Sequence, residues 1–149
     1  MNSEWRQMLE AVRDGAMPVE EALLKLKTAP FADIGYAKVD LHRKLRQGAA
    51  EVIYGAGKTP EQICGIVDVM RQNGQETILI TRLSPESAAE VERCCPLRYC
   101  PEARAAVAGP VPPPAGLGTI VVATGGTSDL PVAEEAALPA AVLGHRVPR

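Results

Sequence analysis

The chain has 149 residues, of which 46% are hydrophobic and 23% are charged, and its formal net charge is −2. This apolar fraction allows a core in one ordinary domain or in two small ones. Aromatic residues make up only 3% of the chain, which excludes the aromatic stacking platforms of single-strand nucleic-acid binders. Because there is no basic run, neither a nucleic acid nor an anionic membrane is an expected partner.

The sequence also carries no export or membrane signal. No apolar stretch approaches the roughly 18–20 residues that a transmembrane helix needs, and residues 1–10 lack the layout of a signal peptide. We therefore predict a soluble, cytoplasmic protein with reduced thiols. The cysteine spacing lacks a C-x2-C pair, so reduced thiols are favoured over a metal site. The four cysteines are Cys64, Cys94, Cys95 and Cys100.

Two short helices are predicted first, as a hairpin over about residues 3–28. In each helix, apolar side chains recur at the spacing of one helical face. They are Trp5, Met8, Leu9 and Val12, followed by Val19, Ala22, Leu23 and Leu26. Both apolar stripes are narrow, so the hairpin must pack on something else.

Residues 51–93 alternate strand and helix patterns. Short strands are predicted at 51–54 and 77–81. Thr59-Pro60-Glu61-Gln62 is a capping box that begins the first helix, and Ser84-Pro85 begins the second. The order strand, helix, strand, helix predicts a parallel pair joined by a right-handed crossover.

A linker rich in proline and glycine at 109–118 separates a predicted domain at 1–108 from a new unit at 119–149. The uninterrupted apolar run 119–123 is typical of a central parallel strand. A glycine loop and a helix follow, and Pro139 is expected to kink or end that helix. One strand and one helix cannot close a sheet. Either another chain completes this unit, or the sequence is part of a longer protein, which we favour.

The loop at 124–129 is the strongest local signal for a ligand. Gly125 and Gly126 let backbone N–H groups approach an anion, and the amino terminus of the helix favours negative charge. Thr127 and Ser128 can donate hydroxyl hydrogen bonds to phosphate, whereas Asp129 suits a sugar hydroxyl or a helix cap. A capping turn without a ligand explains the pattern equally well.

Three basic residues are weaker candidates for anion contacts. Arg43 and Arg46 would share a helical face with Asp40, although a salt-bridged surface is favoured over an anion clasp. Lys58 lies in a glycine turn that lacks the first glycine of a phosphate-binding P-loop. A capped strand-to-helix turn is therefore favoured, from which Lys58 could still reach an anion.

Three stretches together resemble one family. They run from Val122 to Ala137 around the glycine loop, from Asp40 to Gln62, and from Thr81 to Glu86. The combination is similar to pyridinium-3,5-biscarboxylic acid mononucleotide synthase, the B component of lactate racemase maturation, which is related to aminoimidazole-ribotide carboxylase. The resemblance spans about residues 36–144. It implies an α/β fold in which residues 119–149 begin a flavodoxin-like, parallel-sheet carboxylase domain that is incomplete here.

The resemblance implies carboxylation of nicotinic acid adenine dinucleotide at C5 of the pyridinium ring, with carbon dioxide or bicarbonate, and release of AMP. The product belongs to nickel-pincer nucleotide biosynthesis. Mg²⁺ would suit cleavage of the phosphoanhydride, and no tightly bound organic cofactor is expected. A homo-octamer is expected for the full-length family.

The nucleophilic cysteine of the family lies beyond Arg149, and none of the four cysteines matches it. The resemblance thus places no catalytic residue in this chain, which is expected to be inactive on its own. Two alternatives stay open. One is the carboxylase or mutase of aminoimidazole ribonucleotide in purine biosynthesis, whose glycine loop lies near its amino terminus. The other is a non-catalytic nucleotide-binding or assembly module.

Overall fold

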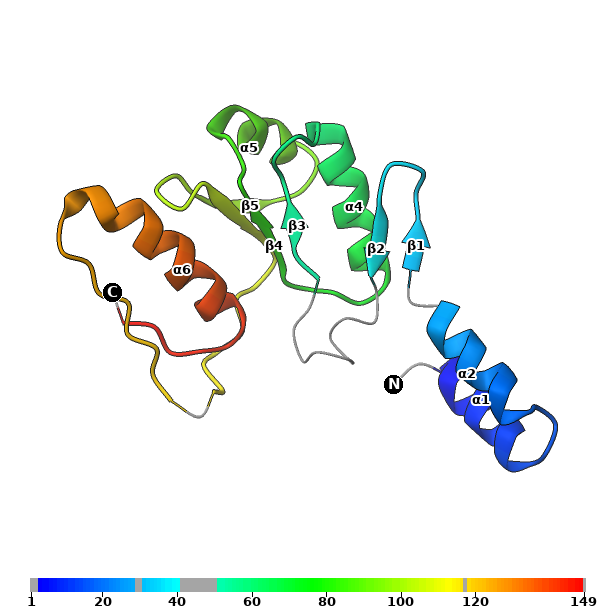
Figure 1. The fold of residues 1–149 in the computed structure, drawn as a ribbon. Coiled ribbons are helices and arrows are strands. Elements are labelled where there is room, and N and C mark those ends of the chain that lie inside the picture. The colour runs from blue at the N-terminus through cyan, green and yellow to red at the C-terminus, as the bar shows by residue number, and fades with distance from the viewer. Residues whose placement is uncertain (1–2, 29–30, 41–50, 117, 149) are drawn as a thin grey trace.

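The computed structural model describes residues 3–28, 31–40, 51–116 and 118–148. Two helices, α1 (Ser3–Arg13) and α2 (Val19–Thr28), form the predicted hairpin, which lies apart from the rest of the molecule (Figure 1). The remaining elements are β1 (Phe31–Asp33), β2 (Lys38–Asp40), β3 (Ile53–Tyr54), α4 (Pro60–Gln72), β4 (Ile78–Thr81), α5 (Pro85–Val91), β5 (Leu97–Cys100), β6 (Ala105–Ala108), η1 (Thr127–Asp129) and α6 (Leu130–Val142).

The main sheet has four strands in the order β3-β4-β6-β5. Strands β3 and β4 are parallel, with Ile53 opposite Ile80, and α4 connects them. This confirms the predicted parallel pair. The antiparallel hairpin of β5 and β6 was not predicted, and it places β6 beside β4. The fold is therefore α/β with a mixed sheet.

Helices cover both faces of this sheet. On one face, α4 and α5 pack on Ile78 and Ile80 of β4. On the other face, Leu138 of α6 packs with Leu79 and Val107. Alternate residues of β4 thus enter two separate cores, as the period of two in a strand requires. Strands β1 and β2 form a separate antiparallel pair, and Val39 of β2 joins the core beneath α4.

Both helices that follow the parallel strands begin as the sequence predicts. The Thr59 hydroxyl accepts a hydrogen bond from the Gln62 backbone N–H, and the Gln62 side chain accepts one from the Thr59 N–H. The Ser84 hydroxyl accepts from the Ser87 N–H at 3.1 Å. These caps satisfy N–H groups that a helix leaves without partners.

The predicted central strand at 119–123 is wrong. These residues join no sheet, and one isolated bridge links Thr119 to Arg146. Ile120 and Val121 keep 38% and 74% of their surface exposed. An apolar run forms a strand only where another strand can pair with it, and no strand of the described chain lies beside this one. The helix after the loop is confirmed as α6, and Pro139 does not end it, because the helix continues to Val142.

The cysteines differ from the prediction as well. Cys64 of α4 and Cys94, which follows α5, form a disulfide with their Cα atoms 6.2 Å apart. This separation lies in the usual disulfide range. It arises because α4 and α5 pack side by side on one face of the sheet, a contact that sequence spacing does not reveal. Cys95 and Cys100 are free thiols.

In the described part of the chain, no helix combines the length and the apolar character needed to cross a membrane.

The disulfide gives the first testable prediction. It closes a loop of 30 residues, so opening it should lower the free energy of unfolding by about 3–4 kcal/mol through chain entropy. We expect Cys64→Ser to unfold at lower urea concentration than the wild type without reductant and at the same concentration with reductant. Cys100→Ser, which removes a free thiol, is the control. Equal wild-type unfolding curves with and without reductant would contradict the prediction.

Candidate functional site

The parallel strands β3 and β4 end at the same edge of the sheet. The Gly55 N–H donates to the Thr81 carbonyl oxygen at 2.7 Å, directly after the paired residues Tyr54 and Thr81. Each strand then turns into a helix, and the capped amino termini of α4 and α5 follow. Ligands of open α/β sheets bind beyond the carboxyl ends of parallel strands, so this carboxyl edge is the place to look for a site.

The turn after β3 depends on Gly55. A Cβ atom at this position would lie 2.8 Å from the Thr81 carbonyl oxygen, closer than real Cβ contacts come. The turn closes where the Lys58 N–H donates to the Gly55 carbonyl at 3.1 Å. Tyr54, just before the turn, keeps 59% of its surface exposed. An aromatic ring and an ammonium group therefore belong to one short segment at this edge.

The turn after β4 holds an arginine in an unusual conformation. Arg82 has φ 54°, in the left-handed region, and so does Arg104, with φ 47°. The two positions are joined because the Leu83 N–H donates to the Arg104 carbonyl at 2.7 Å. The Tyr99 hydroxyl also donates to the Leu83 carbonyl at 3.1 Å. Left-handed backbone costs about 1–2 kcal/mol for a residue with a Cβ, so these hydrogen bonds hold a strained turn.

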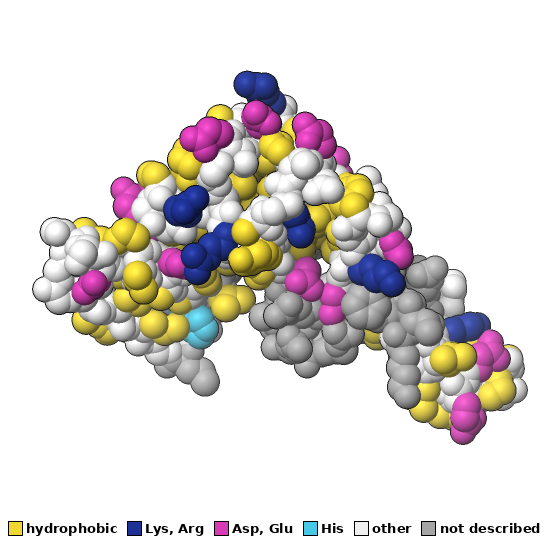
Figure 2. All heavy atoms as spheres, turned by 45° about the horizontal axis from the view of Figure 1, so that its top comes forward, with side chains coloured by type: hydrophobic (Ala, Val, Ile, Leu, Met, Phe, Trp, Pro, Cys, Tyr) yellow, Lys and Arg dark blue, Asp and Glu magenta, His cyan; other side chains and the backbone are white. Residues whose placement is uncertain are grey.

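An ion pair connects this turn to α6. The Arg82 guanidinium contacts the Glu135 carboxylate of α6 with Nη2 and Oε1 3.0 Å apart. Glu86, in the first turn of α5, has a pKa below its ordinary value. Its carboxylate interacts with its own backbone N–H and with Ser84, and the charge of Arg104 adds to this effect. Burial raises the pKa of Tyr99. In Figure 2, where the top of Figure 1 comes forward, Lys and Arg side chains lie across the middle of the view.

The predicted glycine loop lies at the amino-terminal end of α6. Gly125 and Gly126 form a bend, and the exposed residues Thr127, Ser128 and Asp129 form the 3-10 turn η1. Asp129 stands at the cap position of α6, but its side chain makes no capping hydrogen bond. The expected capping role is therefore not observed. A contact of Asp129 with a sugar stays a prediction, as do the phosphate contacts of the other four residues.

The remaining predicted residues are only partly brought together. Lys58 lies at the carboxyl edge, whereas Arg43 and Arg46 fall outside the described residues, and Asp40 ends β2. The glycine loop projects away from the sheet at the far end of α6, well separated from the turn of Lys58 (Figure 1). Sequence reasoning missed Arg82. Its left-handed backbone gives no signal in the sequence, because that conformation is associated with glycine and not with arginine.

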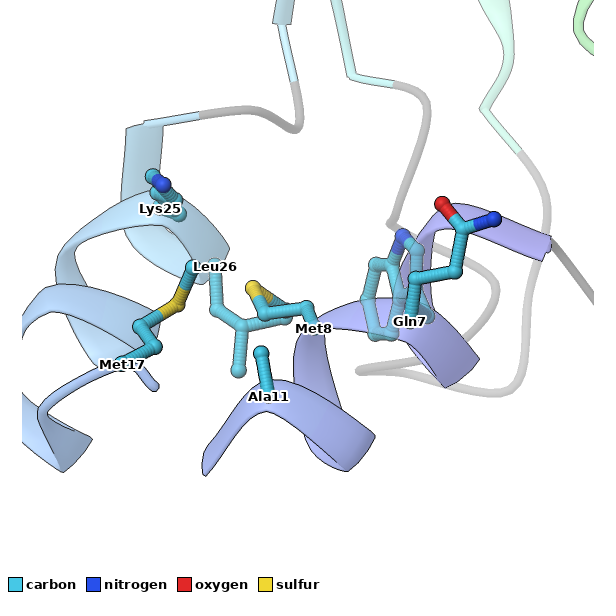
Figure 3. A pocket seen from close by; sticks show the side chains of 7 residues that line it. Gln7, Met8, Ala11, Met17, Lys25 and Leu26 are labelled. Atoms are coloured by element: carbon cyan, nitrogen blue, oxygen red, sulfur yellow. The ribbon is translucent and has the colours of Figure 1, made fainter. Parts of the chain in front are cut away.

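A different hollow lies between the two amino-terminal helices. It measures about 400 Å³ and is mostly apolar, with Met8, Met17 and Leu26 pointing into it (Figure 3). Lys25 and Gln7 supply its polar groups. Lys25 is paired with Glu21 at 2.9 Å. This groove is a seam between two short helices and brings together no acid–base or nucleophilic pair, so we place the candidate site at the carboxyl edge.

Protein-held metal does not fit this site. Among the residues that the structure describes, no three His, Cys, Asp or Glu side chains lie together so that they could hold a metal ion. Glu135 is paired with Arg82, which leaves it unsuited to bind a cation. The described residues thus offer no group of three ligands for Mg²⁺, and binding of Mg²⁺ together with the phosphates of a substrate stays a prediction.

Comparison with known proteins assigns the chain to a family. Residues 31–110 match the family described as LarB/PurE-like N-terminal domain. The chain belongs to this family. The matched segment contains both turns of the carboxyl edge, so Lys58, Arg82 and Arg104 are residues of a LarB/PurE-like N-terminal domain. The glycine loop and Glu135 follow the match.

One curated relative is an uncharacterized protein of Methanocaldococcus jannaschii, MJ0165. The two sequences are 27% identical over an alignment of 143 residues, and this alignment covers 91% of this chain and 56% of that protein. The chain thus spans about half the length of the curated relative that it matches.

The clearance at Gly55 gives the second prediction. Gly55→Ala should lower the free energy of unfolding by about 1–3 kcal/mol, because its Cβ would meet backbone that cannot rotate away. Gly125→Ala is the matched control, since nothing lies within 4 Å of its added Cβ. Urea unfolding followed by circular dichroism measures both. A Gly55→Ala variant as stable as Gly125→Ala would show that β3 and β4 do not approach this closely.

Proposed function

We propose that this chain is the amino-terminal, dinucleotide-binding part of a carboxylase that acts on nicotinic acid adenine dinucleotide. The complete reaction adds carbon dioxide at C5 of the pyridinium ring and releases AMP. The observation that carries the proposal is the match of residues 31–110 to the LarB/PurE-like N-terminal domain. The family is related to carboxylases, and the carboxyl edge carries cationic side chains that could contact an anionic substrate.

The charges at this edge suit the substrate. A pyridine dinucleotide carries two linked phosphates, and Lys58 and Arg82 supply cationic groups on neighbouring turns. Guanidinium groups bind phosphate through paired, charge-assisted hydrogen bonds. The glycine loop offers backbone N–H groups and the hydroxyls of Thr127 and Ser128, and Asp129 can accept from a ribose hydroxyl. In this proposal, these residues bind and orient the dinucleotide.

The described cysteines do not offer a nucleophile for the ring. Addition of a thiolate next to the pyridinium nitrogen would make the ring electron-rich enough to attack carbon dioxide. Cys64 and Cys94 are joined in a disulfide, and burial raises the pKa of Cys95, which disfavours its thiolate. Cys100 is a free thiol on β5. Its Sγ donates to the Glu102 carboxylate at 3.8 Å, whereas reactive cysteines usually lie beside a cationic group. We therefore propose binding of the dinucleotide by this chain without turnover.

Binding measurements test this function. Isothermal titration calorimetry should detect binding of nicotinic acid adenine dinucleotide to the chain, and aminoimidazole ribonucleotide should not compete for the same site. Competition by aminoimidazole ribonucleotide instead would favour the purine enzyme. If the chain binds neither nucleotide, the proposal is refuted, and an assembly module is the alternative that stays open.

The glycine loop gives the third prediction. Gly126→Ala should leave the melting temperature unchanged, because nothing lies within 4 Å of the added Cβ and its φ is −175°. The methyl group should nevertheless weaken dinucleotide binding by about tenfold or more where the backbone must approach a phosphate. Gly118→Ala, which also meets no atom within 4 Å, is the control. Equal affinities of the two variants would remove the loop from the site.

The fourth prediction concerns turnover. The purified chain, incubated with the dinucleotide, bicarbonate and Mg²⁺, should release no AMP above a control without protein, as measured by liquid chromatography. AMP release together with ring carboxylation would show that one of these cysteines, or another group, acts as the nucleophile.

A further inference from the structure

We propose that Arg82 is a phosphate-binding residue of the carboxyl edge. In the free protein, the Glu135 carboxylate pairs with the Arg82 guanidinium, and a bound phosphate displaces this carboxylate. The inference rests on the proposed function for the identity of the whole ligand, a dinucleotide. The displacement of the Glu135 carboxylate from the Arg82 guanidinium can be tested with pyrophosphate alone, whichever nucleotide is the natural ligand.

The backbone of Arg82 is strained. A residue with a Cβ is held at φ 54°, where glycine would be free of strain. Strained residues at the ends of strands persist where the surrounding structure over-determines them, and they cluster in ligand sites. Here the neighbouring hydrogen bonds of Gly55 to Thr81 and of Leu83 to Arg104 fix the turn from both sides. The left-handed turn therefore sets the direction in which the Arg82 side chain leaves the edge.

The ion pair that Arg82 makes with Glu135 is exposed to solvent. Its side chain keeps 57% of its surface exposed, and the Glu135 side chain keeps 36%. Exposed pairs of this kind are weak and change an equilibrium constant by about fivefold at most. A phosphate that accepts two hydrogen bonds from the guanidinium fork forms a stronger contact than such a carboxylate. A phosphorylated ligand can thus displace Glu135 at small cost.

Glu135 lies on the helix that begins at the glycine loop. Asp129 precedes Glu135 by six residues at the start of α6, which corresponds to roughly 9 Å along the helix axis. One dinucleotide can cover such a span. A ligand whose sugar contacts the loop would then carry a phosphate to Arg82.

The experiment measures pyrophosphate binding to the whole chain by isothermal titration calorimetry. Arg82→Gly keeps the left-handed turn and removes the guanidinium, so it should weaken binding about tenfold or more. Glu135→Gln removes the competing charge but keeps the shape, so it should tighten binding by about twofold to fivefold, as expected from losing one exposed ion pair. Arg93→Gly, which removes an exposed arginine just after α5, should bind as the wild type does. Thermal melting of each variant confirms that it is folded.

The inference is overturned if Arg82→Gly binds pyrophosphate as tightly as the wild type, if Glu135→Gln binds no tighter, or if the wild type binds no pyrophosphate. Parallel titrations with nicotinic acid adenine dinucleotide separate this result from the proposed function. If Arg82→Gly binds the dinucleotide as tightly as the wild type does, Arg82 is not part of the binding site, but the proposed function stands. If the variants change pyrophosphate binding as expected but the chain does not bind the dinucleotide, the phosphate site stands and the proposed function is refuted.

Discussion

The burial of β4 on both faces is the constraint on which the rest of the structure depends. Ile78 and Ile80 are fully buried under α4 and α5, and Leu79 is buried under α6. A fully buried aliphatic side chain contributes about 1.5–3 kcal/mol through the hydrophobic effect, and three successive residues of one short strand do so here. The strand is also paired on both edges, with β3 and with β6.

The geometry of the candidate site follows from this central strand. Because β4 and β3 are parallel, their turns meet at one edge, and Gly55 must approach the Thr81 carbonyl there. Because α6 covers the opposite face from α5, Glu135 of α6 can reach Arg82 just after β4. The carboxyl edge thus collects side chains from a turn before α4, a turn before α5 and a helix of the other layer. No single stretch of the sequence contains this combination.

Local chemistry accounts for what could be predicted. The capping residues Thr59 and Ser84 fix where two helices begin, and the apolar spacing around Met8 and Leu23 predicts the amino-terminal hairpin. These features depend on residues within one or two turns of each other, and the structure confirms them. The predicted placement of Lys58 beside a strand end follows from the same local pattern.

Contacts between distant segments account for what could not be predicted. The four small residues of β6 carry no strand pattern, yet they fit between two helical layers because their side chains are short. The apolar run around Val121 has the composition of a strand, but a strand also needs a partner, and none of the described strands lies beside it. The Cys64–Cys94 disulfide and the Arg82–Glu135 pair each join residues that only the packed helices bring together.

Hydrogen–deuterium exchange with and without nicotinic acid adenine dinucleotide tests the central claim most directly. The account predicts that the ligand slows exchange of backbone amides in residues 55–59, 81–84 and 125–129, and leaves α1 and α2 unchanged. Protection confined to the groove between α1 and α2, or no protection at the carboxyl edge, would contradict it.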